Sequence, residues 1–215
     1  MSRIFPPSDD AVSFRGRTIW LEPAGEQHRE LIRPLAKDER IWEFTKTLMI
    51  NDSYDQQFDQ YFDEALALAA IGEQAFIIHA AGEEKMSAPD GISIEKNAII
   101  GMTRIFLVDW KFRRMEIGHT WYIPAVWGKV YNKECKLMLL QYAFEHLRFH
   151  RVQFSVAHQN IRSQKAVEKI GGVKEGVLRK YAIRNDGSRR DTVMFSIIDD
   201  EWPEKKARLL QLIQE

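Results

Sequence analysis

The order of elements in the second half of the chain is the feature that most restricts its fold. Residues 115–123 and 151–157 alternate or concentrate apolar residues as strands do, and residues 132–148 and 161–170 repeat apolar residues at helical spacing. Residues 177–184 and 192–198 follow as a hairpin around Asn185, Asp186 and Gly187, residues that suit a tight turn. The pattern strand, helix, strand, helix, strand, strand predicts a mixed α/β fold.

The first half predicts further strands and two helices, with one long connection. Strands are expected at 17–23, 74–80 and 98–108, and a helix at 26–36. A second helix, capped by Asp52 or Ser53, ends at Gly72. The polar segment 82–97 is predicted to be a loop that is longer than usual hairpin connections.

Nothing in the sequence marks a domain boundary. With 45% hydrophobic residues, 215 residues can bury a full core. We find no internal repeat and no low-complexity linker, so the sequence predicts a single domain over 1–215, with a core at about 14–202 and a short C-terminal helix at 203–215.

The charge balance and the single cysteine narrow the classes of partner. Lys plus Arg equals Asp plus Glu at 31 each, which leaves no overall positive field for nucleic acid or anionic membrane. No apolar run has the length of a membrane span or a signal peptide, and Cys135 alone cannot form an internal disulfide. We therefore expect a cytoplasmic protein that binds neither nucleic acid nor membrane.

The turn after the strand 115–123 has the features of an anion site. Backbone N–H groups in the first turn of a helix lack acceptors, and the helix dipole adds positive charge there. Lys129 and Lys133 would add full charges, and Gly128 lets a ligand approach the backbone. The alternative is an ordinary strand-to-helix turn with Asn132 as N-cap and two solvated lysines.

A second helix start lies at Asn160, which suits an N-cap, with Ser163 at the third helical position. Gly171 or Gly172 ends this helix in a left-handed turn. Local structure explains all of these residues. In the functional interpretation, Asn160 and Ser163 also face a ligand that lies between the two helix starts.

Together these segments resemble the GNAT superfamily of N-acetyltransferases, and in particular its RimL/RimJ-like branch, the ribosomal-protein N-terminal acetyltransferases. The resemblance runs from about Phe14 to Glu204, and is carried by EIGHTWYIPAVWG, NKECKLMLLQYAFEHL, HRVQFSV, NIRSQKAVEKIGGVKEGVLRK and DGSRRDTVMFSIIDDEWP. It implies a splayed, mixed, mostly antiparallel sheet of about seven strands flanked by about four helices. It also implies acetyl-CoA as cosubstrate, with the cofactor-binding residues Trp121, Tyr122, Ile123, Gly128, Lys129, Val130, Tyr131, Asn132, Lys133, Asn160 and Ser163.

One departure from the family pattern concerns the pyrophosphate loop. Val130 and Asn132 stand where the usual loop has glycines. A similar subgroup starts its helix with an Asn-x-Glu-x-Lys pattern, matched here by Asn132, Glu134 and Lys136. The backbone donors persist without the glycines, provided that Val130 avoids a positive φ.

Acetyl transfer needs a base for the attacking amine, and Glu116 is the first candidate, acting directly or through a water. Strand alternation predicts Glu116, Gly118, Thr120 and Tyr122 on one face and His119 with Trp121 on the other. The alternative, to which we give equal weight, is that Glu116 is a structural carboxylate paired with Arg113 or Arg114. His119 and His158 are lesser candidates for the base.

The acid that protonates the departing thiolate is not selected by the sequence. Ser163 is one candidate, although a hydroxyl is a weak acid, and the family's usual tyrosine is replaced by Val167. Tyr181 and Tyr122 are the alternatives. Cys135 is expected in the core. His146 and His150 have a metal-ligand spacing without a third ligand nearby, so no metal is expected.

The amine acceptor is a peptide N-terminus or a small amine, and its wall is expected at residues 42–44 and 184–190. The rival hypotheses are a noncatalytic CoA-binding sensor or interaction module, and a different nucleotide-binding α/β protein. The second lacks a P-loop signature. The Trp-rich surface could support a homodimer.

Overall fold

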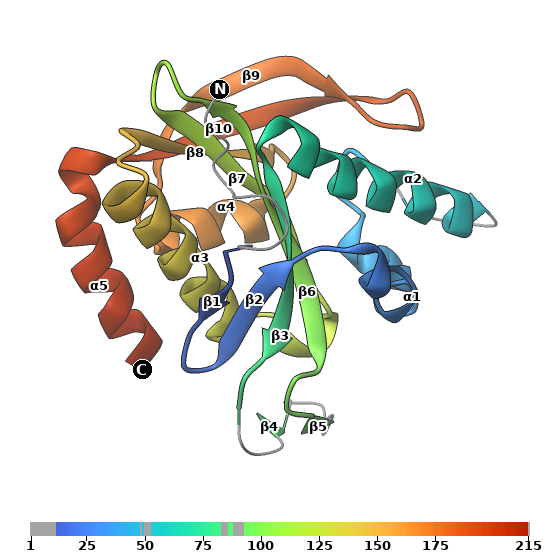
Figure 1. Cartoon of the computed structure of the whole chain (residues 1–215). Coiled ribbons are helices and arrows are strands. Elements are labelled where there is room, and N and C mark those ends of the chain that lie inside the picture. Colours follow the sequence, from blue (N-terminus) through green and yellow to red (C-terminus); the bar gives the residue numbers. More distant parts are fainter. Residues whose placement is uncertain (1–11, 48, 50–52, 83–85, 88–92, 215) are drawn as a thin grey trace.

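The computed structural model describes residues 12–47, 49, 53–82, 86–87 and 93–214, and its centre is an eight-stranded sheet (Figure 1). Every neighbouring pair of strands in this sheet is antiparallel except β7 and β8, which are parallel. A short hairpin of β4 (Met86–Ser87) and β5 (Ser93–Ile94) stands apart. In spatial order the sheet contains β1 (Phe14–Arg15), β2 (Ile19–Pro23), β3 (Gln74–Ala80), β6 (Ile99–Asp109), β7 (Arg114–Tyr122), β8 (Arg151–Ala157), β10 (Arg189–Ile198) and β9 (Val173–Ile183).

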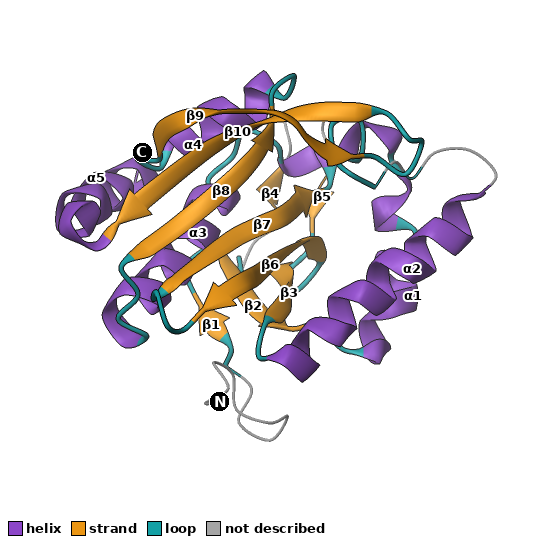
Figure 2. Cartoon of the chain, turned by 90° about the horizontal axis from the view of Figure 1, so that it is seen from above, coloured by secondary structure: helices purple, strands orange, loops and turns teal. Residues whose placement is uncertain are grey.

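Helices cover both faces of the sheet (Figure 2). One face carries α1 (Arg29–Ile32) and α2 (Tyr54–Ala67), and the other carries α3 (Tyr131–Gln141), α4 (Ile161–Lys169) and α5 (Trp202–Gln214). Each face has its own cluster of buried apolar side chains. Among the residues described, no helix combines the length and the apolar character needed to cross a membrane. The mixed, mostly antiparallel architecture is confirmed: the described residues form eight strands in the main sheet and five α-helices, where about seven strands and four helices were expected.

The strands and helices of the second half match the sequence prediction closely, and the N-terminal helix does not. The predicted helix at 26–36 is wrong: this stretch forms a 3₁₀ turn, the four-residue α1 and a second 3₁₀ turn that begins after Pro34. A proline cannot donate the helical hydrogen bond and disfavours the preceding helical turn. The helix predicted to end at Gly72 is present, with its last turn as a 3₁₀ turn over Leu68–Ile71 before Gly72. Ser53 occupies the N-cap position, but its side chain makes no capping hydrogen bond, and Asp52 lies outside the described residues.

The helix after β7 begins one residue earlier than predicted. Val130 is the N-cap residue and Tyr131 the first helical residue, so the prediction of Asn132 as N-cap is wrong. The helix continues from Tyr142 to His146 as a π-helical turn. Because Asn132 therefore lies inside the first turn, its side chain is not used to cap the helix.

Candidate functional site

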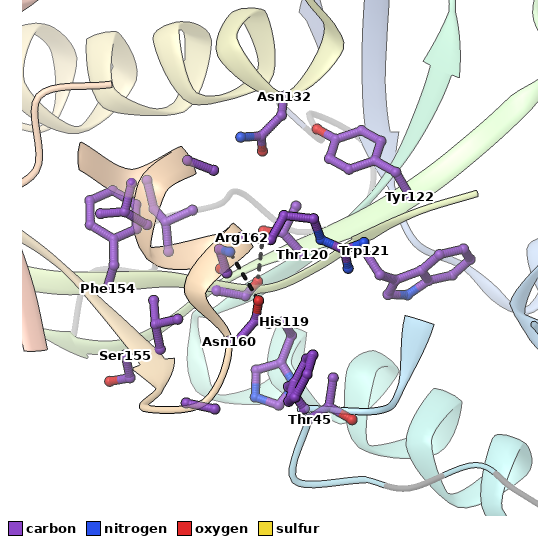
Figure 3. Close-up of a pocket in the computed structure, with 18 of the residues that line it drawn as sticks. Thr45, His119, Thr120, Trp121, Tyr122, Asn132, Phe154, Ser155, Asn160 and Arg162 are labelled. Atoms are coloured by element: carbon purple, nitrogen blue, oxygen red, sulfur yellow. Dashed lines mark hydrogen bonds between the residues drawn. The ribbon is translucent and has the colours of Figure 1, made fainter. Parts of the chain in front are cut away.

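A cavity opens where β7 and β8 separate. Their parallel pairing covers only Arg114 to Glu116 of β7, opposite Arg151 to Gln153 of β8, although both strands continue beyond this register. A cavity of about 460 Å³ lies in the resulting space (Figure 3). Its walls come from the end of β7, from β8, from the starts of α3 and α4, and from residues 41–47. The split in the sheet thus brings together elements that are distant in sequence.

The backbone conformation explains how the helix start survives without the usual glycines. Val130 has φ −66° and ψ −26°, so it adopts ordinary helical angles and carries no strain. Gly128 has φ +77°, and a Cβ there would meet no atom within 4 Å. The left-handed conformation, not crowding, therefore favours glycine at this turn.

The structure brings most of the predicted cofactor residues to the cavity, and leaves some out. Gly128, Lys129, Asn132 and Lys133 line it, together with Trp121 and Tyr122 of β7. Ile123 and Val130 are not among the lining residues, and the side chain of Tyr131 is buried in the core below α3.

Lys133 uses its charge within the protein. Its Nζ donates a hydrogen bond to the carbonyl oxygen of Leu212 at 2.6 Å, in the last turn of α5. This contact satisfies a carbonyl that has no partner within the helix. Asn132 extends instead into the space between α3 and α4 (Figure 3).

The start of α4 forms the opposite wall, and its predicted cap is confirmed. The Asn160 side chain accepts a hydrogen bond from the backbone N–H of Ser163 at 2.9 Å. Both residues line the cavity. Between them along the helix, the guanidinium of Arg162 lies 3.7 Å from the ring centroid of Trp127, which links the α4 side to the β7–α3 turn.

The backbone N–H of Tyr122 faces the gap from the free edge of β7. The N–H of Ile123 donates to the carbonyl of Ile100 on β6 at 2.9 Å. Because hydrogen-bonded and non-hydrogen-bonded pairs alternate in an antiparallel ladder, the N–H of Tyr122 points away from β6, toward β8. The carbonyl of Tyr122 accepts from the indole of Trp127 at 2.8 Å. Of the stretch Trp121–Ile123, Tyr122 is thus the residue whose backbone faces the gap.

A β-bulge at His119 overturns the predicted division of β7 into faces. The register with β6 shifts between Met102 and Arg104, and His119 has φ +48°. Ile117 and Tyr122 consequently both pack in the core against α3, although they are five residues apart. The prediction that Glu116 and Tyr122 share a face is therefore wrong. Glu116 lies on the opposite side, the side on which Trp121 packs against the α2 core.

Glu116 is buried and lines the cavity, with an exposed fraction of 4%. Gln153 of β8 donates to its Oε2 at 3.0 Å. The alternative pairing with Arg113 or Arg114 is wrong, because Arg114 pairs with Asp109 at 3.2 Å and Arg113 donates to the carbonyl of Arg148. The carboxylate therefore faces the cavity with an amide as its neighbour.

Lys136 entered the sequence analysis only as part of the Asn-x-Glu-x-Lys pattern. In the structure it is a buried residue of the cavity wall. Its side chain is 5% exposed and lines the cavity. Its Nζ donates to Oγ1 of Thr120 at 2.6 Å, and Oγ1 of Thr103 lies 3.4 Å away. No carboxylate of the described residues lies within ion-pair distance of it. Burial lowers the pKa of this lysine.

Glu134, the acidic residue of the Asn-x-Glu-x-Lys pattern, has a structural role. The Glu134 side chain, 5% exposed, accepts hydrogen bonds from the backbone N–H groups of Arg17 and Thr18 at 2.5 and 2.8 Å. It also accepts one from the Thr18 hydroxyl. This carboxylate joins α3 to the start of β2, on the side away from the cavity. The sequence signal that could have identified Lys136 as a site residue is its position among the apolar residues of the same helix.

The remaining candidates for proton transfer are less suited to it. Burial, with a smaller contribution from nearby cations, lowers the pKa of His119 to about 3, so this imidazole is a weak base. His158 and Tyr181 are exposed and do not line the cavity. Burial raises the pKa of Tyr122 well above its usual value. The Cys135 thiol is fully buried with a raised pKa, in keeping with its predicted place in the core.

Titratable groups also gather outside the cavity. The two histidines with a metal-ligand spacing in the sequence have different partners. His146 packs on Tyr142, and the Nδ1 of His150 contacts an oxygen of Asp199 at 2.7 Å. Glu22, His28 and His79, which sequence reasoning missed, converge within 4.8 Å of one another. The Nδ1 of His28 accepts from the N–H of Gly25, so its Nε2 carries the proton that it donates to Glu22. That nitrogen has no lone pair for a metal.

Comparisons with known proteins agree with this geometry. Residues 18–173 match the family model "Acetyltransferase (GNAT) domain". The Bacillus subtilis protein "Putative ribosomal N-acetyltransferase YdaF" is 33% identical over 110 residues, which is 51% of this chain and 58% of YdaF. The chain therefore covers less than two thirds of that relative.

Two solved structures illustrate the likeness of the fold. A "putative acetyltransferase" from T. thermophilus is 32% identical and superimposes with a TM-score of 0.76, over 93% of this chain and 95% of that one. The structure "Mycobacterium smegmatis RimJ in complex with CoA-disulfide" is 20% identical, with a TM-score of 0.71 over 90% and 88% of the chains. The family match, which spans most of the chain, and the split sheet lead to one conclusion: the chain belongs to the GNAT acetyltransferase family.

Proposed function

We propose that this protein is an acetyl-CoA-dependent N-acetyltransferase in which an amine attacks the thioester directly. The observation that carries the proposal is the gap between β7 and β8. On one side of β7 the gap has two helix N-termini, and on the other it has the buried carboxylate Glu116. Anion-binding backbone on one side and a proton acceptor on the other are what acetyl transfer from a pyrophosphate-containing donor requires.

The cofactor would bind through backbone groups more than through charge. Its pyrophosphate would lie at the first turn of α3, near Gly128, Lys129 and Asn132, with Asn160 and Ser163 on the facing helix. The N–H of Tyr122 would pair with the pantetheine or with the thioester oxygen, where negative charge develops during attack. Since Lys133 is held by Leu212, we assign it a smaller part than the sequence implied.

Glu116 would accept the proton of the attacking amine, directly or through a water. The nitrogen then forms its bond to the carbonyl carbon, and the tetrahedral intermediate expels the CoA thiolate. Two side chains could protonate that thiolate, Ser163 and Lys136. We favour Lys136, because a buried ammonium is more acidic than a hydroxyl and Thr120 holds it against β7, on the α3 side.

The acceptor class is the finer part of the proposal. The name of the YdaF relative refers to a ribosomal N-acetyltransferase, which supports a peptide α-amine as acceptor. A small-molecule amine is the alternative, since related folds serve different acceptors. Trp42 and Phe44 line the acceptor side of the cavity, and Arg190 is the residue of the predicted segment 184–190 that reaches it.

Release of free thiol from acetyl-CoA tests the proposal. We would incubate the protein with acetyl-CoA and a panel of N-terminal peptides and small amines, and measure thiol together with acetylated product. We expect release that depends on the amine. Tight CoA binding without release for any amine would instead support a noncatalytic sensor. A preference for ATP over CoA in calorimetric titrations would contradict both interpretations.

A further inference from the structure

The acceptor side of the cavity contains a buried cation that forms no ion pair with any described residue. Arg190 of β10 is 9% exposed and lines the cavity. Its Nη1 donates to the carbonyl of Phe44 at 2.8 Å, and its Nε has no hydrogen-bond partner. Burying a guanidinium with an unmet donor costs free energy unless a partner arrives. Such a donor in a cavity wall points to a ligand group that accepts from it.

Two further cations lie near Arg190. Lys46 lines the same cavity, and Arg104 is buried nearby, with its Nη2 on the carbonyl of Tyr61. Across the part of the chain that the structure describes, none of these three cations lies within ion-pair distance of a carboxylate. The carboxylate that acts electrostatically on Arg190 is Glu116, which Gln153 already engages.

We propose that the acceptor carries a carboxylate close to its reacting amine, and that Arg190 binds this carboxylate with help from Lys46. The inference rests on the proposed acetyltransferase function and names its substrate class. A guanidinium has a planar set of donors that suits a carboxylate, and the Nε of Arg190 has no hydrogen-bond partner among the described residues. The amine of the same molecule would then lie near Glu116.

The same charges would serve the chemistry. Cations beside a bound ammonium lower its pKa, which favours the neutral amine that attacks the thioester. They also repel acceptors that carry several positive charges and no anion, so a polyamine should be a poor substrate. The carboxylate can come from a free α-amino acid or from an acidic side chain near a peptide N-terminus, and these two sources differ in size.

Matched pairs of acceptors test the inference. The first arm compares peptides that have Asp or Asn as second residue, and the second compares an α-amino acid with its carboxamide. In the arm that contains the true acceptor class, we expect kcat/KM for the acid to exceed that for the amide by about tenfold or more, as for a charge-assisted hydrogen bond. A polyamine should be acetylated less well than the preferred acid.

Variants assign the effect to Arg190. We expect Arg190→Gln to remove the preference for the acid, and Lys46→Gln to reduce it. Arg189→Gln, which alters an exposed neighbour on β10, is the matched control and should keep it. Because Lys46 is exposed, its variant tests the inference even if Arg190→Gln does not fold.

Three outcomes would overturn the inference: equal use of acid and amide in both arms, a polyamine as the best acceptor, or an acid preference that survives both Arg190→Gln and Lys46→Gln. Each of them leaves the acetyltransferase proposal intact, because an amine is still acetylated. If the wild-type protein binds CoA but acetylates no amine of either arm, the proposed function itself fails.

Discussion

The two sides of β7 use different physical means to prepare for a ligand. On the α3 side, the proposed recognition elements are backbone groups at the starts of α3 and α4 and at Tyr122, whose positions are fixed by secondary structure. On the other side, the proposed elements are the side chains of Glu116 and Arg190, which come from distant segments and form no ion pair among the described residues. We therefore expect the proposed cofactor side to tolerate changes of side chain, as at Val130, and the proposed acceptor side to depend on individual residues.

The largest effect is expected at Glu116. Glu116→Gln keeps the size of the side chain and removes its basicity, so turnover should fall by about 10²-fold, as when a general base is lost. The dissociation constant of acetyl-CoA, measured by calorimetry, should not change, because Glu116 lies on the side of β7 opposite the two helix starts. A loss of acetyl-CoA affinity as large as the loss of turnover would show that the two sides of β7 do not have separate roles. Unchanged turnover would show that Glu116 is not the base.

Lys136 tests whether the α3 side also contributes to the chemistry. We expect Lys136→Met to lower turnover by about tenfold, because the thiolate loses its proton donor. The acidity of bound CoA should reveal the cause: thiolate absorbance, followed against pH, should appear at higher pH in the variant than in the wild type. Identical titrations would show that Lys136 does not act on the thiol.

The lowered pKa of Lys136 also predicts a change in stability with pH. Between the depressed pKa of the folded state and the usual value of 10.5, the unfolded chain binds the proton and the folded chain does not. The free energy of unfolding of the wild type should therefore rise with pH through this alkaline window, relative to Lys136→Met. Denaturant unfolding at several pH values measures it, and a constant difference would contradict the assignment.

His119 makes a corresponding prediction in acid. With a folded pKa of about 3 and a usual value of 6.5, the imidazole stays neutral in the fold while the unfolded chain takes up a proton. Stability should therefore be lost as pH falls from 6.5 toward 3. We expect His119→Asn to remove about 2 kcal/mol of this loss, and asparagine tolerates the positive φ at this position. This figure is smaller than the full pKa shift would give, because the His119 side chain is partly exposed to solvent. Parallel pH curves for both proteins would contradict this.

The smallest effect concerns the turn before α3. Gly128→Ala should cost about 1 kcal/mol of stability, because φ is +77°, and should weaken acetyl-CoA binding a few-fold. Gly187→Ala is the matched control: φ is +81°, a Cβ there also meets no atom, and the turn is outside the cavity. It should show a similar cost in thermal unfolding with unchanged cofactor affinity. Equal affinities for both variants would place the pyrophosphate elsewhere.

The sequence predicted the features that depend on local signals and missed those that depend on the pairing of distant segments. Strand and helix periodicity placed β3 and β8 correctly, and an N-cap asparagine correctly marked the start of α4, because these signals are local. Pro34 was a local signal too, and the helix prediction at 26–36 overlooked it. By contrast, the bulge at His119 shifts one strand against its neighbour, so a single residue reversed the predicted faces of β7.

Side chains that act across long sequence distances were beyond sequence reasoning. The contact of Arg190 with Phe44 joins residues 146 positions apart, and that of Lys136 with Thr120 depends on how α3 lies on the sheet. No periodicity encodes such contacts. A charged residue within an apolar stretch is the one hint that the sequence offers, and it identifies the residue without its partner.

The most direct test of acetyl transfer by this protein is a parallel measurement of free thiol and acetylated amine, made with acetyl-CoA and the preferred acidic acceptor. We expect both products to appear at the same rate, in a one-to-one ratio, only in the presence of the protein and the amine. Thiol without acetylated amine would indicate hydrolysis of the thioester, and neither product despite bound CoA would indicate a binding module. Either result would contradict the proposed acetyl transfer.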